Sequence, residues 1–421
     1  MTKIKNLLFR TFLTLPFGKV QVDTVKEWDE YLQKRMILSK SFCQDTHGKE
    51  HSKKKAILCI AFLTSSVVSF FGPLFLRTDA SYAEITMRGA IFHVLGFSGR
   101  VIMIPAIFVC GQALLYRILF LVLEKNNDMA FLHDFANFRS LTLLKNETKR
   151  KFAMRSHLFF RVFKVSGEAS FIGGATFCCL SGIYSSMVEP SVGNILIWSF
   201  WSLVTSMDCY LACIDIVTLG CFWFVCRTLV KLVIQQIIDD LEEVISFSWS
   251  SRCNTDRIRK SFQVWHKNYL LTKRILSNFN DFSKQFLFIL ISTSSFVSAG
   301  QLLSAIKSDD LIIKLTVLTC FTSMAINVMI LLKSATTISA EGTRLYVKVN
   351  EAMVHLGHYL SVMDRHILME TLEDLGSLSR PGVTLTTLGG TPYDPLAFAS
   401  FVMSFILIFL MFFDFLHLIL K

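Results

Sequence analysis

Long apolar stretches alternate with shorter polar segments along the whole chain. A helix that crosses a bilayer needs about 20 mostly apolar residues. Seven stretches meet this requirement: residues 56–76, 89–123, 166–188, 194–234, 285–306, 311–332 and 396–420. The second and the fourth are longer than one crossing needs, so we expect both helices to project well beyond the bilayer. The pattern predicts an all-α membrane protein with seven transmembrane helices.

Two of the polar segments also have a helical period. Apolar side chains recur at close to every 3.6 residues in residues 252–284 and again in residues 340–376, which is typical of amphipathic helices. The first set is Ile258, Phe262, Trp265, Tyr269, Leu270, Ile275 and Phe279, and the second is Leu345, Val349, Met353, Leu356, Leu360 and Met363. The acidic run in residues 239–243 predicts that the fourth helix continues into water. A solvated helix face explains that run better than a metal site does.

Positive charge is concentrated on one side of the apolar stretches. Lysine and arginine number 12 in residues 1–55, nine in 124–165, seven in 233–283 and five in 333–395. The opposite side holds four, which are Arg77, Arg88, Lys307 and Lys421. Cytoplasmic loops of membrane proteins carry the excess of positive charge. We therefore expect a cytoplasmic N-terminus, an extracellular C-terminus and helices that extend into a cytoplasmic base.

This orientation divides the chain into four parts. Residues 1–55 form a cytoplasmic N-terminal segment, whose first 20 residues read as an amphipathic surface helix rather than a cleavable signal peptide. Residues 56–332 hold the first six helices with their cytoplasmic extensions. Residues 333–395 form a cytoplasmic loop that completes the base, and residues 396–421 form the last transmembrane helix.

Composition and charge narrow the class further. Hydrophobic residues make up 52% of the chain, and the formal net charge is +11. The positive residues lie between the apolar stretches, which indicates membrane topology rather than a nucleic-acid partner. The 11 cysteines fall in apolar or expected cytoplasmic segments, where they serve as small buried hydrophobes. The N-terminus inside and the lack of an outer-loop disulfide exclude a G-protein-coupled receptor.

The last apolar stretch carries a family resemblance. It reads Ser404-Phe405, then five apolar residues at 406–410, then Met411-Phe412. This is the spacing of the gustatory-receptor signature, Thr-Tyr, five hydrophobic residues and Gln-Phe. Residues 387–394 resemble the glycine-containing approach to that helix. Together with the seven stretches and the short outer loops, these features resemble an insect-type gustatory receptor, within the gustatory and odorant receptor superfamily.

The resemblance implies a ligand-gated, non-selective cation channel at the plasma membrane. Four subunits, identical or related, would surround one pore lined by the last helix of each. Each subunit would bind a small-molecule tastant in the outer half of its helix bundle. The ions would be sodium and potassium, with calcium as a further candidate. An odorant receptor subunit, a non-channel seven-helix receptor and a transporter remain as alternatives.

Pore candidates lie on or near one stripe of the last helix. They are Ser404, Leu407, Ile408, Met411, Phe412, Asp414 and Phe415. Four copies of Ile408, Met411 and Phe412 would make a constriction that closes by dewetting, although ordinary helix packing also explains the stripe. Met411 stands where the family has Gln, which removes a polar pore group. Four Asp414 carboxylates would form a ring that attracts cations, or Asp414 would reach the outer interface beside His417.

Ionisable groups inside a membrane usually face water or a partner. Arg100 of the second stretch and Asp208 of the fourth lie at similar depth, so we expect them to pair. Asp215 lies seven residues after Asp208 on the same helix face, with Thr319 or Asn327 of the sixth stretch as alternative candidate partners.

Aromatic and hydroxyl groups of the outer halves would form a pocket for a sugar or an amphipathic organic molecule. The ligand-binding candidates are His93, Phe97, Arg100, Tyr184, Trp198, Trp201, Asp208, Ser294, Ser295, Gln301 and Thr316. Interfacial anchoring explains Trp198 and Trp201 equally well.

No motif in the sequence points to catalysis, a nucleotide cofactor or a resident metal. His355 and His358 are three residues apart on an expected helix, where two solvent-facing histidines are a simpler interpretation than a metal site. We expect no enzymatic activity, no cofactor and no metal.

Overall fold

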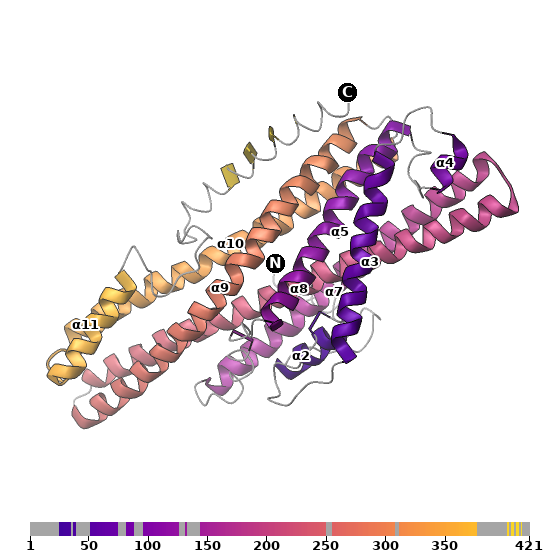
Figure 1. Cartoon of the computed structure of the whole chain (residues 1–421). Helices are drawn as coiled ribbons and strands as arrows, with labels where there is room; N and C mark the ends of the chain where they lie inside the picture. The colour runs from indigo at the N-terminus through magenta and orange to yellow at the C-terminus, as the bar shows by residue number, and fades with distance from the viewer. Residues whose placement is uncertain are drawn as a thin grey trace, which may run out of the picture.

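The structure is a computed structural model of the full chain, and every regular element in its described part is a helix (Figure 1). The described residues are 25–34, 37–38, 51–74, 81–87, 96–125, 131–132, 144–249, 255–307, 311–376, 402–403, 406–407, 410–411 and 414.

Six long helices account for most of the described chain. They are α3 (His51–Leu74), α5 (Gly96–Lys125), α7 (Asn146–Val188), α8 (Val192–Ser248), α9 (Thr255–Lys307) and α10 (Leu311–Leu356). Three short helices are α2 (Val25–Lys34), α4 (Tyr82–Met87) and α11 (Val362–Gly376). Each of the first six predicted stretches overlaps one long helix, in the predicted order. The long helices run side by side, and α11 lies at the end where α8 turns back into α9 (Figure 1).

Three helices of the described chain have segments long and apolar enough to cross a membrane, namely Ala106–Glu124, Val192–Ser248 and Thr255–Ile306. Two shorter apolar segments, Ile57–Val68 and Ile172–Val188, lie in α3 and α7. The prediction of an all-α membrane fold is confirmed. The count of seven spans and the orientation of the termini stay predictions.

Helix α8 is the central element of the fold. It has 57 residues, which at about 1.5 Å per residue makes it far longer than a bilayer is thick. It therefore continues through the acidic run, as predicted for the fourth stretch. Between Thr218 and Leu229 every side chain is buried, because α7, α9, α10 and α5 pack around this segment.

The buried apolar side chains form two clusters. The larger one, here called the inner core, is rich in aromatic rings and draws on α2, α5, α7, α8, α9, α10 and α11. The smaller one, here called the outer cluster, consists of Leu63, Met103, Cys110, Ala113, Cys178, Trp198 and Ala212. Ile216 of α8 packs against both and marks their boundary.

The predicted amphipathic helices form the base of the inner core. All the predicted apolar positions of residues 252–284 are buried in α9 except Leu270, which is 50% exposed because it points away from its buried neighbour Tyr269. The second amphipathic pattern is divided, because α10 ends at Leu356 and α11 begins at Val362. Met363, beyond that break, is 70% exposed.

Candidate functional site

The outer cluster is tied together by a chain of three polar groups. The Trp198 indole N–H of α8 donates to the Tyr82 hydroxyl of α4 at 2.8 Å. That hydroxyl donates to the backbone oxygen of Ser185 in α7 at 2.8 Å. The short helix α4 is thereby fixed against the α7–α8 hairpin. The Trp198 side chain is buried, so it packs inside the bundle and does not form the open wall of a ligand pocket.

Close backbone approach holds α7 against α8 in this region. A Cβ atom added to Gly182 would lie 1.8 Å from the Ser202 hydroxyl, and one added to Gly174 would lie 2.4 Å from the Cys209 sulfur. A side chain at either glycine would force the Ser202 hydroxyl or the Cys209 thiol to move, as in small-residue helix interfaces of membrane proteins. At the turn between α7 and α8, the Ser191 side chain caps α8 by accepting from the Asn194 backbone N–H at 3.1 Å.

Asp208 lies on the face of α8 that points into the outer cluster. Its side chain is buried, and it accepts a hydrogen bond from the Ser66 hydroxyl of α3 at 2.5 Å. Asp208 and its Ser66 partner place a buried carboxylate and a hydroxyl beside the outer cluster. The predicted pairing of Asp208 with Arg100 is untested, because the Arg100 side chain lies outside the described part.

A buried ion pair lies between the outer cluster and the inner core. Arg117 of α5 and Asp215 of α8 are 3% and 2% exposed, and the guanidinium Nη2 donates to Oδ1 at 2.8 Å while Nε donates to Oδ2. Bidentate geometry offsets the cost of burying both charges. Asp215 pairs with a residue 98 positions away that the apolar pattern had placed inside a span. A contact of Asp215 with Thr319 or Asn327 stays a prediction, because the side chains of both lie outside the described part.

Several buried polar atoms of α5 and α9 have no hydrogen-bond partner in the described chain. They include both amide atoms of Gln112, the hydroxyls of Ser294 and Ser298 and Oε1 of Gln301. Gln112 lies on the face of α5 that packs against α9, one turn from the Phe108–Phe296 stack and one turn from the Tyr116–Phe286 stack. An unpaired buried amide costs stability, so these groups are available to a small polar ligand or to water.

The other predicted pocket residues occupy different settings. Ser295 donates to the Ile291 backbone oxygen at 2.9 Å, and Tyr184 is 58% exposed on the outside of the bundle. Trp201 is half-buried against the outer cluster. His93 and the side chains of Phe97 and Thr316 lie outside the described part of the chain.

The last predicted span is described at a few positions. Leu407 and Met411 are 57% and 73% exposed in the single subunit, and Asp414 is exposed as well. Their spacing of four and three residues places them on one helix face. Ser404, Ile408, Phe412 and Phe415 lie outside the described residues. The pore-lining role of all seven stays a prediction.

No group of three metal-ligating side chains gathers anywhere in the described residues. The His355 ring instead packs edge-on against Trp249 at a centroid distance of 5.4 Å.

Sequence patterns alone did not identify Arg117, Gln112, Ser66 or Tyr82 as important. Arg117 could have been found from one signal: it is a charged residue within the second apolar stretch, and the fourth apolar stretch carries acidic residues that could pair with it. The remaining three needed the packing of the helices to be known.

The fold is similar to that of the insect olfactory receptor OR5 from Machilis hrabei. The structure of that receptor in complex with eugenol aligns with a TM-score of 0.58 and 10% identity, over 93% of this chain and 98% of that chain. A second structure of the receptor gives a TM-score of 0.58 and 9% identity, over 92% and 98%. No family model matches the chain, and no curated protein matches its sequence. The resemblance inferred from the last span is confirmed at the level of the fold, which an insect chemoreceptor shares along nearly its full length.

Proposed function

We propose that this chain is a chemosensory receptor subunit that acts as a ligand-gated, non-selective cation channel at the plasma membrane. Its N-terminus lies in the cytoplasm, a small molecule binds in the outer half of the helix bundle, and the last helix lines the pore. The likeness to an insect olfactory receptor over 93% of this chain is the observation that carries the proposal. The signature spacing from Ser404 to Phe412 supports it independently.

The outer half offers groups suited to a small amphipathic ligand. The unpaired amide of Gln112 lies one helical turn from each of two ring stacks between α5 and α9, and Ser294 and Gln301 of α9 also carry unpaired buried atoms. A hydroxyl or carbonyl of a ligand would satisfy these atoms, while its apolar part would pack on the rings. Eugenol, bound by the structural neighbour, combines such features and is a suitable first compound for a ligand panel.

The gustatory subtype is the first candidate, because the spacing of the last helix follows the gustatory signature. An odorant receptor subunit is the second candidate, because the structural neighbours are olfactory receptors. The two differ in partner more than in fold. Either kind of channel would be a homotetramer or a heterotetramer with related subunits.

Whole-cell recording in a heterologous cell tests the function directly. A panel of sugars, bitter compounds and volatile phenols should evoke an inward current carried by sodium and potassium. The chain is tested alone and with candidate partner subunits, which shows whether it conducts as a homomer or needs a partner. Binding without current in every combination would reject the channel.

The Asp414→Asn variant examines the proposed pore in the same cells. If four Asp414 carboxylates form a ring, their neutralisation lowers cation permeability relative to anions. Lys314→Gln, which changes an exposed charge near the start of α10, is the matched control and should leave permeability unchanged. Equal permeability ratios in the Asp414 variant and the parent channel would remove the ring from the proposal.

A further inference from the structure

Two arginines lie near each other between α7 and α8, on the side of the Arg117–Asp215 pair that faces the base. Arg227 of α8 is 8% exposed, and Arg155 of α7 is half-buried. Neither forms an ion pair with a residue of the described chain. A charge that leaves water is costly unless a group of opposite charge accompanies it, so this position favours an anion.

The packing of the two helices places both arginines at the same height. Contacts between α7 and α8 follow one antiparallel register, from Gly182 against Ser202 and Gly167 against Val217 to Phe159 against Phe224. Three residues beyond Phe224, Arg227 is therefore level with residue 156, three before Phe159. Arg155 precedes Phe159 by one helical turn and shares its face of α7. Both arginines thus lie one turn from the Phe159–Phe224 contact and within electrostatic range of each other.

The Arg227 guanidinium is held on one side only. Its Nε donates to the Ser334 backbone oxygen of α10 at 2.9 Å, and its central carbon lies 5.7 Å from the centroid of the Phe224 ring. The two terminal nitrogens donate to no residue of the described chain. A fixed, planar guanidinium with terminal N–H groups to spare suits two parallel hydrogen bonds to phosphate or carboxylate oxygens.

The local charge balance also favours an anion. Glu341 of α10 is the carboxylate that acts on Arg227, and it already lies 3.4 Å from the Lys231 ammonium. Arg155, Arg227 and Lys231 therefore share one carboxylate. Two of their three positive charges are left without compensation from this carboxylate.

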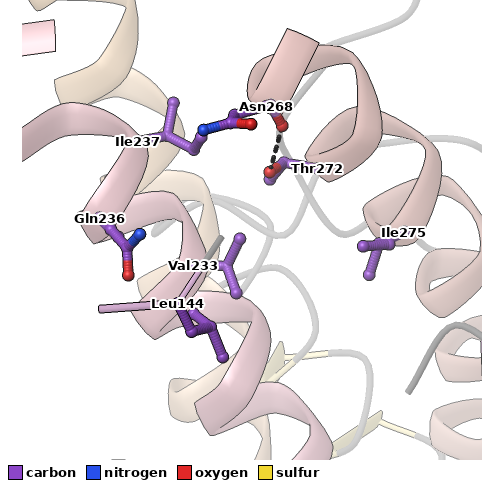
Figure 2. A pocket seen from close by; sticks show the side chains of 7 residues that line it. All are labelled: Leu144, Val233, Gln236, Ile237, Asn268, Thr272 and Ile275. Carbon is purple, nitrogen blue, oxygen red and sulfur yellow. Dashed lines mark hydrogen bonds between the residues drawn. The ribbon is translucent and has the colours of Figure 1, made fainter. Parts of the chain in front are cut away.

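The surroundings of the two arginines leave one side for an anion to approach. Glu27 of α2 acts on His157, which points away from Arg155 on α7, so the α2 side already carries a negative charge. The side of α8 that faces α9 is closely packed. The cavity bordered there by Val233 and Gln236 has a volume of about 10 Å³, about the room that one water needs (Figure 2). An anion therefore reaches the arginines beside Arg155.

The depth of the site matches the inner headgroup layer of a bilayer. Arg227 follows residue 194, the predicted outer start of its span, by 33 residues, which is roughly 50 Å along the helix axis. A bilayer with its headgroups is about 40–45 Å thick, and a helix tilt of about 20° brings Arg227 slightly closer to it. Both lipid phosphates and cytoplasmic solutes are within reach at this depth.

We propose that Arg155 and Arg227 bind a phosphate group. Its oxygens accept from the terminal nitrogens of Arg227 and from Arg155, so that one phosphate bridges α7 and α8. An acidic lipid of the cytoplasmic leaflet and a soluble organic phosphate both carry this group. A phosphate monoester has a charge of about −1.5 to −2 at pH 7, which offsets two cations. The inference rests on the proposed function only for the orientation of the chain.

Native mass spectrometry of the full chain in detergent tests the site, because it counts each bound molecule. The chain is titrated with dioctanoyl phosphatidic acid, a phosphate monoester, and with dioctanoyl phosphatidylcholine as the neutral reference. The first phosphatidic acid should bind at least about tenfold more tightly than the first phosphatidylcholine, the effect of one charge-assisted contact. A third titration with inositol hexakisphosphate asks whether a soluble phosphate binds instead.

Charge variants identify the binding groups. Arg155→Gln leaves Arg227 and its contacts in place, and should weaken phosphate binding at least about tenfold. Arg150→Gln removes an exposed cation from another face of α7 and is the matched control, with an expected change of less than twofold. Arg227→Lys keeps the buried charge but loses the planar fork, so it should also weaken binding. Thermal melting in the same detergent shows that each variant is folded.

The outcomes separate clearly. A preference for phosphatidic acid that is lost in Arg155→Gln supports a lipid source, and binding of inositol hexakisphosphate that is lost in the same variant supports a soluble source. Equal binding of the two lipids, with no soluble phosphate bound, overturns the proposal. Phosphate binding that is unchanged in Arg155→Gln also overturns it. None of these results depends on current through a channel, so the proposed function stands or falls separately.

Discussion

The outer cluster and the inner core are packed from different kinds of side chain. The inner core fills the space between its helices with large rings, among them Trp28, Trp223, Phe279 and Phe286, all almost fully buried. The outer cluster has one large ring, Trp198, among small residues such as Cys110, Ala113 and Ala212. Its helices are held by glycine contacts and by hydrogen bonds through Tyr82 and Ser66.

This difference indicates which part is rigid and which is adaptable. Interlocked rings lose many contacts if they shift, so the inner core favours one arrangement of its helices. Small side chains and polar contacts leave the outer helices fewer contacts to lose. The proposed function, ligand binding at one end and gating of a pore, would use such a division, with the Arg117–Asp215 pair at its boundary.

The boundary ion pair carries the largest expected effect. Asp215→Ala leaves the Arg117 guanidinium buried and uncompensated, which costs about 3–5 kcal/mol. We expect little folded protein, measured as the monodisperse fraction of a fluorescent fusion on size exclusion. Arg117→Met combined with Asp215→Leu removes both charges and should recover most of the folded fraction. Failure of the double variant would show that the pair is needed for more than charge balance.

Glycine contacts of the outer cluster come next. Gly182→Leu forces α7 away from Ser202 in α8, and overpacking of this kind costs about 1–3 kcal/mol. Gly173→Leu is the matched control on the same helix, because a Cβ there meets nothing within 4 Å. Melting followed by native tryptophan fluorescence should show a clear drop for the first and little change for the second. Equal melting temperatures would mean that α7 and α8 are free to separate, and the outer cluster would then be looser than its contacts indicate.

The sequence predicted the helices well because their signal is local. A period of 3.6 placed Ile258, Phe262 and Trp265 on a buried face, and the structure buries all three. It could not choose partners, because Arg117 and Asp215 meet only once α5 and α8 are packed. Hydropathy also fails to separate a lipid-facing side chain from a pocket side chain. Tyr184 was for that reason a pocket candidate, whereas the structure exposes it on the outside of the bundle.

Replacing Gln112 should change stability by a smaller amount than the preceding variants and in the opposite direction. Its amide is buried without a partner, so Gln112→Met should stabilise the chain by about 1 kcal/mol. Gln235→Met is the control, since Gln235 donates to Glu341 at 2.6 Å and its loss should destabilise the base. Thermal melting measures both. If Gln112 serves the ligand site, the more stable variant should also respond less to agonist in whole-cell recording, and an unchanged response would leave Gln112 outside that site.

A pH dependence of the base is the smallest effect and concerns the inner core alone. Burial on α9 lowers the pKa of His266, against the opposing influence of Glu370 and Asp364 on α11. The folded chain therefore binds a proton at His266 less readily than the unfolded chain does. The contribution of His266 to the free energy of unfolding is complete above the ordinary histidine pKa near 6.5, and it is lost as the pH falls below that value. His266→Gln should therefore flatten the fall in melting temperature between about pH 6.5 and 5.5. A slope equal in the His266→Gln variant and the parent protein would assign the acid sensitivity to other groups.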